Sequence, residues 1–207
     1  MFRKQALWVT MMLLVVSSVD AAHSIHDFVA HNDLERVSQL LKEHATSVDQ
    51  ANRYDERPLH LAQTPEMIEL LIRRGADVNI ENHFGDSPLL QAVYRGDHGL
   101  VELLIERGAN IDHKNRFGDT PLREAARRDL IVMVQILVDR GANLNMQNRH
   151  GETVLHAAVR RGNHSMVRVL VAGGAGVDIE DEDGYSPIDL AVGYNMKKEL
   201  TVQKRRR

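Results

Sequence analysis

Histidine is the residue type in this sequence that could support the widest range of chemistry. The 207 residues include 11 histidines, and imidazole can bind a metal ion or transfer protons near neutral pH. However, His60 and His156 occupy one position of a repeated sequence pattern, and His98 and His164 occupy another. Recurrence of this kind indicates a structural role. A metal-dependent enzyme that uses the histidines is therefore the least favoured of the functions considered.

No other catalytic pattern assembles. The sequence lacks an HExxH pair, a GxSxG nucleophile turn and a glycine-rich phosphate loop. It contains no cysteine, which excludes thiol catalysis and thiolate metal sites. We therefore expect no catalytic residue, no metal site and no cofactor, in a protein that is not an enzyme.

The strongest signal is an internal repeat. A Gly-Ala pair recurs at one constant interval, at Gly75, Gly108, Gly141 and Gly174. A second glycine recurs at the same interval, at Gly85, Gly118, Gly151 and Gly184. Pro88 and Pro121 keep this spacing, whereas Pro58 stands closer to Pro88 than the interval requires. Such regularity is the signature of a repeat protein, here with one early repeat three residues short.

Each repeat predicts two short helices and a turn. A hydroxyl residue followed by proline, as in Ser87-Pro88, is typical of a helix start. A second apolar-periodic segment follows and ends at a glycine such as Gly108, where a left-handed residue is expected. In the short repeat, Pro65 should begin the second helix, and Asp55 takes the turn position that Gly85 holds elsewhere.

A helix, turn, helix and β-turn at this constant interval, with "TPL" at the first helix and "GADVN" after the second, resembles the ankyrin repeat family. The resemblance covers about residues 52–193 and includes "DSPLLQA", "DTPLREAA", "ETVLHAAV" and "YSPIDLAV". Residues 22–51 resemble a degenerate N-terminal capping repeat. Residues 194–207 read as a basic C-terminal tail, either a poor helix or a frayed end. The resemblance implies an all-α solenoid of helix–turn–helix–β-turn units with about four to five stacked repeats.

Residues 1–21 predict a secretory signal peptide. They have a positively charged start, an apolar run over residues 6–16, and the small residues Val19 and Ala21 at the −3 and −1 positions of a cleavage site. Eleven helical residues would span only about 16 Å, well short of a hydrocarbon core roughly 30 Å thick. The alternative that the segment is kept as an uncleaved membrane anchor stays open. We expect an exported protein, periplasmic if bacterial and otherwise secreted, with no membrane insertion after cleavage.

The resemblance implies that partners contact the turn tips and the exposed ends of the first helices. The tip residues are Tyr54, His83, Phe84, Arg116, Phe117, Arg149 and His150. The helix-end residues are Tyr94, Arg95, Arg127, Arg128, Arg160, Arg161 and Tyr194. We expect these two sets to form the partner-binding surface.

Two rows of residues stand out in this surface. An aromatic or histidine ring recurs at one tip position from Tyr54 to His150, and arginine recurs at the end of the first helices. Exposed aromatic rows are typical of interfaces, and arginine pairs can bind carboxylates bidentately. Alternatives stay open for both rows. Phe84 and Phe117 could pack against neighbouring turns. The arginines could form an ordinary solvated face, or could pair within the protein with Glu124, Glu152 and their neighbours.

The function predicted from the sequence is a non-catalytic scaffold for protein–protein interaction. It would bind an acidic surface or segment of another protein on its concave face, with Phe84 and Phe117 as anchors and Arg128 and Arg161 as charge clamps. The alternative is a secreted effector or inhibitor that blocks a partner enzyme. We expect a monomer and no binding to nucleic acid, since the four charges of the terminal "KRRR" are few for that purpose.

Overall fold

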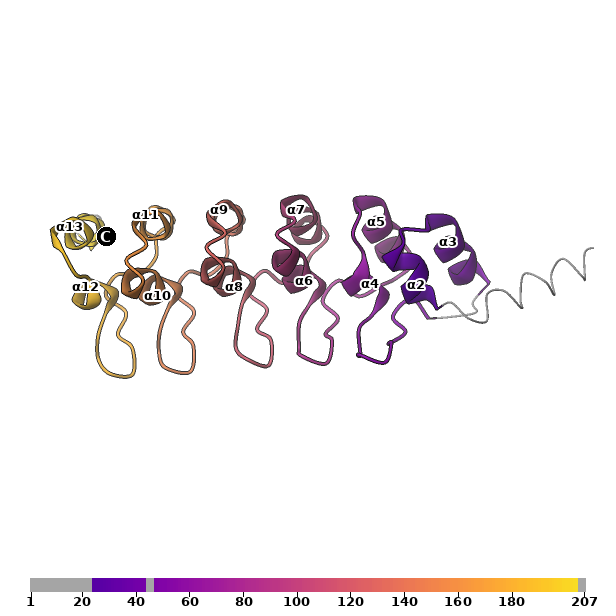
Figure 1. Cartoon of the computed structure of the whole chain (residues 1–207), viewed down its shortest axis with the longest axis horizontal. Helices are drawn as coiled ribbons and strands as arrows, with labels where there is room; N and C mark the ends of the chain where they lie inside the picture. Colours follow the sequence, from indigo (N-terminus) through magenta and orange to yellow (C-terminus); the bar gives the residue numbers. More distant parts are fainter. Residues whose placement is uncertain (1–23, 44–46, 205–207) are drawn as a thin grey trace, which may run out of the picture. The chain divides into compact units, whose positions relative to one another are not determined.

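The computed structural model describes residues 24–43 and 47–204, which form short helices joined by turns, with no strand among them (Figure 1). The chain divides into two compact units between Asp77 and Val78. The expected signal peptide, residues 1–21, lies outside the described residues. Within the described ranges, no helix is both long and apolar enough to cross a membrane.

The N-terminal unit contains two helix pairs. Its helices are α2 (Ile25–Ala30), α3 (Leu34–Lys42), α4 (Pro58–Leu61) and α5 (Pro65–Arg73). Helix α2 packs against α3 and α4, and both of these pack against α5. The contacts bury Val29, Val37, Met67 and Leu71 completely. The degenerate sequence before residue 52 thus forms a helix pair like those that follow it.

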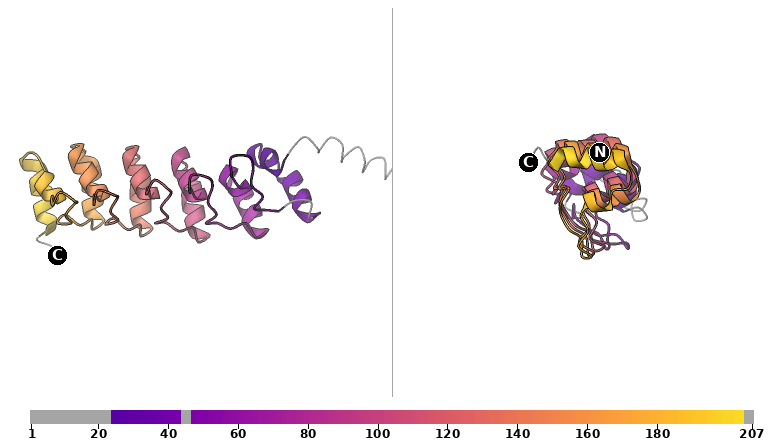
Figure 2. Two further views of the ribbon diagram at one scale, coloured as in Figure 1. Left: turned by 90° about the horizontal axis from the view of Figure 1, so that it is seen from below. Right: turned by 90° about the vertical axis from the view of Figure 1, so that its left-hand side faces the viewer.

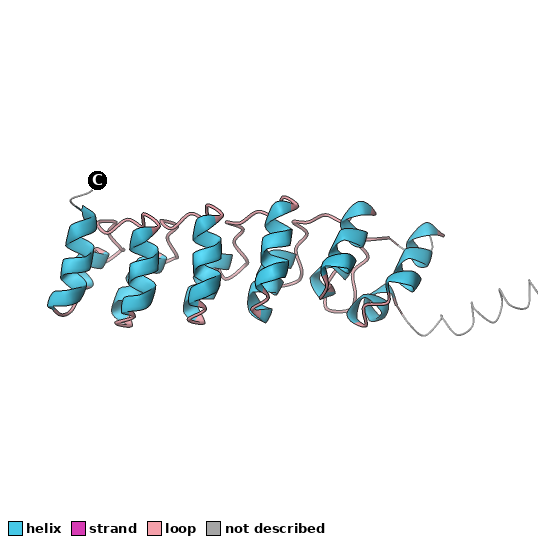
Figure 3. Ribbon diagram, turned by 90° about the horizontal axis from the view of Figure 1, so that it is seen from above, coloured by secondary structure: helices cyan, strands magenta, loops and turns pink. Residues whose placement is uncertain are grey.

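The C-terminal unit contains four further helix pairs, stacked in chain order (Figures 2 and 3). The helices are α6 (Pro88–Arg95), α7 (His98–Glu106), α8 (Pro121–Arg127), α9 (Ile131–Asp139), α10 (Val154–Arg160), α11 (His164–Ala172), α12 (Pro187–Leu190) and α13 (Tyr194–Lys204). Their shared core comes from buried residues at equivalent positions of successive repeats, such as Leu104, Leu137 and Leu170. The predicted all-α, helix–turn–helix architecture is confirmed.

The helices begin as the sequence predicted. The Ser87 side chain accepts a hydrogen bond from the Leu90 backbone N–H at 3.3 Å, and a proline occupies the first helical turn. Thr120 caps α8 in the same way through the Arg123 N–H at 3.2 Å. Each cap satisfies a backbone donor that a helix leaves unpaired, which fixes where the chain turns into the helix.

Two histidines take part in this capping. His60 Nδ1 accepts from the Arg57 backbone N–H, and His156 Nδ1 accepts from the Thr153 N–H, both at 3.0 Å. Because Nδ1 accepts, Nε2 carries the proton, and His156 Nε2 donates to the Tyr185 carbonyl at 3.1 Å. Both rings are buried. Their recurrence in the sequence therefore has a structural cause.

The short repeat differs from the others as its sequence predicted. Helix α4 has only 4 residues where α6 has 8, and α5 begins at Pro65. Asp55 adopts a left-handed backbone with φ of 59°, which aspartate tolerates better than most residues.

The last repeat is shortened in the same way, which the sequence analysis did not anticipate. Helix α12 has 4 residues and is followed after three residues by α13. Met196 and Leu200 are buried where α13 packs against α11 and α12. The sequence left two alternatives for residues 194–207, a poor helix or a frayed tail. Up to Lys204 the chain forms the helix. Residues 205–207 lie outside the described ranges.

Candidate functional site

An asparagine, or an aspartate in the last repeat, shapes the tip of each turn through side-chain bonds to the backbone. Asn115 Oδ1 accepts from the backbone N–H groups of Phe117 and Asp119, both at 3.0 Å. Asn148 Oδ1 accepts from the His150 N–H at 2.9 Å in the next turn. The same position is held by Asn52, Asn82 and Asp181. This recurrence was readable in the sequence, although the sequence analysis did not use it.

The phenylalanines of the aromatic row pack together and yet remain accessible. The Phe84 and Phe117 ring centroids lie 6.4 Å apart with an interplanar angle of 27°, and His83 meets Phe84 edge-on at 5.6 Å. Phe84 is 53% exposed and Phe117 is 63% exposed. Packing on the neighbouring turn therefore covers only part of each ring, and the outer part remains open to a partner.

Tyr54, the first residue of the aromatic row, belongs to the N-terminal unit. Its ring is exposed and lies under the Arg53 guanidinium at 4.7 Å. The side chain of Tyr194 lies outside the described residues, so its predicted contact role stays a prediction.

The first arginine pair is bound within the protein. Arg127 donates to both oxygens of Glu124 at 2.8 and 2.9 Å, and Arg128 Nε donates to Glu124 Oε1 at 2.5 Å. The Glu124 side chain is only 1% exposed. Arg128 also donates to the Tyr94 carbonyl at 2.9 Å and lies 5.2 Å from the centre of the Tyr94 ring. For these residues the internal-pairing alternative describes the geometry.

The second pair is also engaged. Arg160 binds the Glu152 carboxylate and donates to Asp181 Oδ2 at 3.0 Å. Arg161 Nη1 donates to the Arg127 carbonyl at 3.1 Å. Because this carbonyl carries no net charge, Arg161 keeps a positive charge that no carboxylate within the described residues neutralises by direct contact.

Tyr94 is half-buried rather than a free helix end. Its hydroxyl donates to Asp86 Oδ1 at 3.2 Å. Burial raises the pKa of Tyr94 above its usual range, and the Asp86 charge adds to this effect. Its neighbour Arg95 is exposed.

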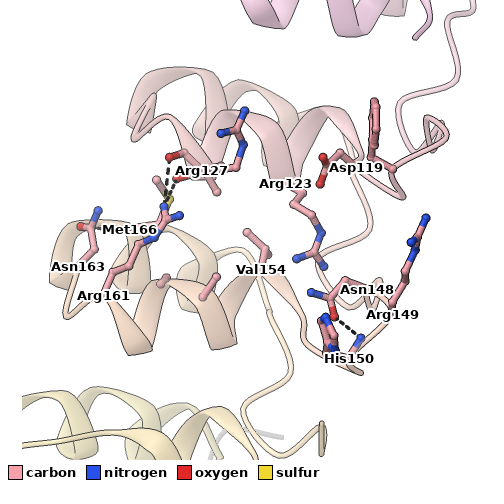
Figure 4. Close-up of a pocket in the computed structure, with 14 residues that line it drawn as sticks. Asp119, Arg123, Arg127, Asn148, Arg149, His150, Val154, Arg161, Asn163 and Met166 are labelled. Atoms are coloured by element: carbon pink, nitrogen blue, oxygen red, sulfur yellow. Dashed lines mark hydrogen bonds between the residues drawn. The ribbon is translucent and has the colours of Figure 1, made fainter. Parts of the chain in front are cut away.

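A pocket of about 350 Å³ opens between the repeats that carry α8 and α10 (Figure 4). We call it the α8/α10 pocket. Its floor is apolar and consists of Ala126, Val154, Ala157, Ala158 and Met166. The volume lies at the low end of the range of roughly 300–1,000 Å³ for ligand pockets, which suits one large side chain and its flanking groups.

The rim of the α8/α10 pocket is basic. Arg123, Arg127, Arg149 and Arg161 line it. Figure 4 shows Arg161 at one end and Arg149 near His150 at the other. The remaining lining residues are Phe117, Asp119, Asn148, His150 and Asn163. Four guanidinium groups around an apolar floor favour an anionic ligand with an apolar portion.

Burial shifts the pKa of two charged residues that line the pocket. Burial lowers the pKa of Arg123, whose Nη2 donates to the Glu152 carbonyl at 2.8 Å. Burial likewise raises the pKa of the Asp119 carboxyl, and the nearby Glu124 carboxylate raises it further, while Arg123 and Arg127 oppose this shift. Asp119 is the one carboxylate among the lining residues.

The pocket lies where the pairing between turn tips is interrupted. The Arg116 N–H donates to the Phe84 carbonyl at 3.0 Å, and the Glu182 N–H donates to the His150 carbonyl at 3.0 Å. At the step between them, no such bond joins the Arg149 N–H to the Phe117 carbonyl among the described residues. We call this the open step.

The space around the turn glycines also distinguishes the open step from the two flanking steps. A Cβ atom at Gly85 would lie 2.9 Å from the next turn's backbone, and one at Gly151 would lie 2.7 Å from it. A Cβ atom at Gly118, at the open step, would have no neighbour within 4 Å.

Substitution of these glycines should therefore have unequal effects. Gly118→Ala should lower the free energy of unfolding by about 1 kcal/mol, the cost of a left-handed alanine, since its φ is 82°. Gly151→Ala should cost about 1–3 kcal/mol more, because its similar φ of 73° is combined with a backbone clash. Urea unfolding measures both, and equal losses would contradict an open step at Gly118.

Five of the predicted contact residues line the α8/α10 pocket: Phe117, Arg127, Arg149, His150 and Arg161. The structure does not bring the others into it. Sequence reasoning missed the apolar floor, because the alanines of α10 look like ordinary core residues. It also missed Arg123, which occupies in its repeat the position that His156 holds in the next. Among the described residues, no group of three His, Asp or Glu side chains is arranged to hold a metal ion.

Comparison with known sequences identifies the repeats. Family models described as ankyrin repeats match residues 63–148 and residues 137–191. The chain is 36% identical over 84 residues to ankyrin repeat domain-containing protein 13C of Xenopus tropicalis. It is 34% identical over 83 residues to the Homo sapiens protein of that name. Each alignment covers 39% of this chain, and the chain spans about a sixth of the length of these relatives.

Solved structures share the fold over most of the chain. The ankyrin repeat domain of Bcl-3 aligns with a TM-score of 0.69 and 27% identity, covering 86% of this chain and 98% of that one. An ankyrin repeat domain from Acinetobacter baumannii AYE aligns with a TM-score of 0.76 and 30% identity, covering 87% and 97%. With its repeat length, helix pairs and asparagine-shaped turns, the chain belongs to the ankyrin repeat family.

Proposed function

We propose that this protein is a non-catalytic interaction module that binds an acidic segment of another protein at the α8/α10 pocket. The observation that carries the proposal is the lining of that pocket, in which four arginines and one carboxylate surround an apolar floor. Ankyrin repeat proteins generally mediate protein–protein interactions, which supports a protein as the ligand.

The contact roles follow from which groups remain available. Among the described residues, Arg149 donates to the Arg116 carbonyl at 3.3 Å, and Arg161 donates to the carbonyls of Arg127 and Ala126 at 3.1 and 3.5 Å. Arg128 is held by a buried carboxylate and an aromatic ring. We therefore assign the charge-clamp role to Arg149 and Arg161 instead of Arg128. Phe117 lines the pocket, and Phe84 supports it by stacking.

Selection from a displayed library of random peptides provides the first test and a probe. We expect the enriched sequences to be rich in Asp and Glu around an apolar residue, because this composition matches the lining of the pocket. A selection that enriches no acidic sequence would contradict the proposed function.

The aromatic contact can be tested with a selected peptide. Phe84→Ala combined with Phe117→Ala should weaken binding about tenfold or more in fluorescence anisotropy, because a large apolar contact is removed. The thermal unfolding curve should change little, since both rings are mostly exposed. Tyr185→Ala removes another exposed ring of the same unit and serves as the matched control. A large loss of stability would instead make the phenylalanines core residues.

Asp119 should weaken binding of an anionic peptide at neutral pH. Asp119→Asn is expected to tighten binding about three- to tenfold, roughly 1 kcal/mol, by removing a nearby like charge. Because its pKa is raised, Asp119 becomes neutral at a higher pH than an ordinary aspartate as the pH falls. The ratio of wild-type to variant Kd should then approach one on acidification, whereas a ratio independent of pH would contradict this role.

The raised pKa of Asp119 also predicts how the free energy of unfolding changes with pH. A carboxyl whose pKa is higher in the folded state than in the unfolded state stabilises the fold most when it is protonated, below the unfolded value of 3.8. This contribution is lost as the pH rises through the folded pKa. Asp119→Asn should therefore be the more stable protein at pH 7, and its advantage in urea unfolding should disappear in acid.

We also propose that the chain is exported, on the basis of the sequence of residues 1–21. The intact mass of the protein recovered from the exported fraction should then correspond to a chain that begins at Ala22. Recovery of the uncleaved chain inside the cell would contradict this proposal.

A further inference from the structure

At the open step, one backbone acceptor and one backbone donor of residues that line the α8/α10 pocket do not bond to each other among the described residues. The Phe117 carbonyl and the Arg149 N–H lie at equivalent positions to groups that bond directly at the two flanking steps. Here the Arg149 side chain crosses to the neighbouring turn, where Nη2 donates to the Arg116 carbonyl at 3.3 Å. Polar backbone groups of this kind favour a ligand that can bond to both.

A single peptide group carries both of the complementary partners, one donor and one acceptor. In a trans peptide, the C=O and N–H point in opposite directions, so one peptide group placed between the two turns can donate to Phe117 and accept from Arg149. At the flanking steps the equivalent groups bond to each other directly, so the bridging peptide group would take the place of that direct bond. An extended segment would then continue past the pocket with its side chains on alternate sides.

We propose that the acidic partner binds as an extended segment in which one peptide group bridges the Phe117 carbonyl and the Arg149 N–H, while an adjacent apolar side chain enters the α8/α10 pocket. This inference rests on the proposed function and specifies its ligand. Carboxylates on either side of the apolar residue pair with Arg149 and Arg161. The apolar side chain contacts the floor at Val154, Ala157 and Met166.

Charge complementarity favours a separate partner over the chain's own ends. Residues 197–207 are predominantly basic and would be repelled by the arginines of the rim. The segment "EDEDGY" at residues 180–185 has a suitable composition. However, its Glu182 N–H already bonds to His150 within the same row of turns. Insertion of this segment from a second copy is therefore treated as the competing outcome.

A set of N-methylated peptides tests the bridge on the unaltered protein. Starting from a selected acidic peptide, each backbone N–H is replaced in turn by N-methyl, and Kd is measured by fluorescence anisotropy. Methylation of one amide, next to the apolar residue, should weaken binding about tenfold or more, whereas the others should change it less than about threefold. Uniform tolerance of N-methylation would overturn the bridge while leaving the proposed function intact.

A pocket-filling substitution tests the second half of the proposal. Ala157→Leu places a larger side chain on the floor and should weaken binding about tenfold or more. Ala172→Leu makes the same change at an exposed site at the end of α11 and should leave Kd unchanged. Circular dichroism checks that both variants fold, and the smaller change Ala157→Val takes the place of Ala157→Leu if the latter does not. Equal binding by both folded variants would overturn the placement of the apolar side chain.

A measurement of self-association distinguishes a separate acidic partner from insertion of residues 180–185 of a second copy. Sedimentation velocity should show one species whose size is independent of concentration, with or without peptide. Concentration-dependent dimers that the peptide dissociates would overturn the proposal in favour of residues 180–185 of a second copy. If no acidic peptide binds at all, the proposed function fails together with this inference.

Discussion

Replacing Arg127 and Arg128 together by alanine should lower the free energy of unfolding by about 3 kcal/mol. Both guanidinium groups donate to the Glu124 carboxylate, whose side chain is 1% exposed. Their removal leaves a buried charge without its partners, which typically costs about 3–5 kcal/mol. We expect the lower value, because water can enter where the two half-exposed arginines are removed. Urea unfolding of the double variant measures the loss.

The reason for that loss can be isolated with Glu124→Gln. Added to the double variant, this change removes the unpaired charge and should restore more than half of the lost stability. Arg107→Ala with Arg168→Ala removes two exposed arginines elsewhere in the unit and should cost less than about 1 kcal/mol. If the Arg127/Arg128 variant were as stable as this control and bound peptide more weakly, the two arginines would be partner contacts, as the sequence suggested.

Asn115→Ala should be the second strongly destabilising change, with an expected loss of about 3 kcal/mol. The Asn115 side chain accepts from two backbone N–H groups and donates to Asp86 Oδ1 at 2.8 Å, and the residue is 6% exposed. Alanine would leave these buried groups without partners, at about 1–3 kcal/mol for an unsatisfied group. Phe117 and Asp119 would also lose their fixed positions at the pocket, so peptide binding should weaken with stability.

Asn110 provides the matched control. It makes a similar local bond, since its Oδ1 accepts from the Asp112 N–H at 3.1 Å, but it is exposed. Asn110→Ala should therefore cost less than about 1 kcal/mol. Equal losses for the two variants would show that the buried network of Asn115 does not hold the turn.

Most of the fold could be predicted from the sequence, because each repeat carries its own local signals. Ser87-Pro88 and Thr120-Pro121 fix helix starts through bonds between near neighbours, and those bonds are present. The early three-residue deletion was visible from the spacing of Pro58. The equivalent shortening in the last repeat was missed, since Tyr194 begins α13 without a proline to mark it.

The candidate site was less predictable, because it depends on contacts between repeats. The sequence placed Arg128 and Arg161 at equivalent helix ends, yet of these two only Arg128 pairs with a buried carboxylate among the described residues, since Glu124 is replaced by Ala157 one repeat later. The open step has no sequence signature either. Gly118 follows the same pattern as Gly85 and Gly151, and only the packing of neighbouring turns distinguishes them.

Methyl NMR spectroscopy tests the central claim most directly. With alanine and methionine methyl groups labelled, a selected acidic peptide is titrated into the protein. Binding at the α8/α10 pocket should shift the methyl signals of Ala157, Ala158 and Met166, while those of Ala172 and the buried Met133 of α9 stay in place. Peptide binding that leaves the three pocket methyls unchanged and shifts signals elsewhere would contradict the account.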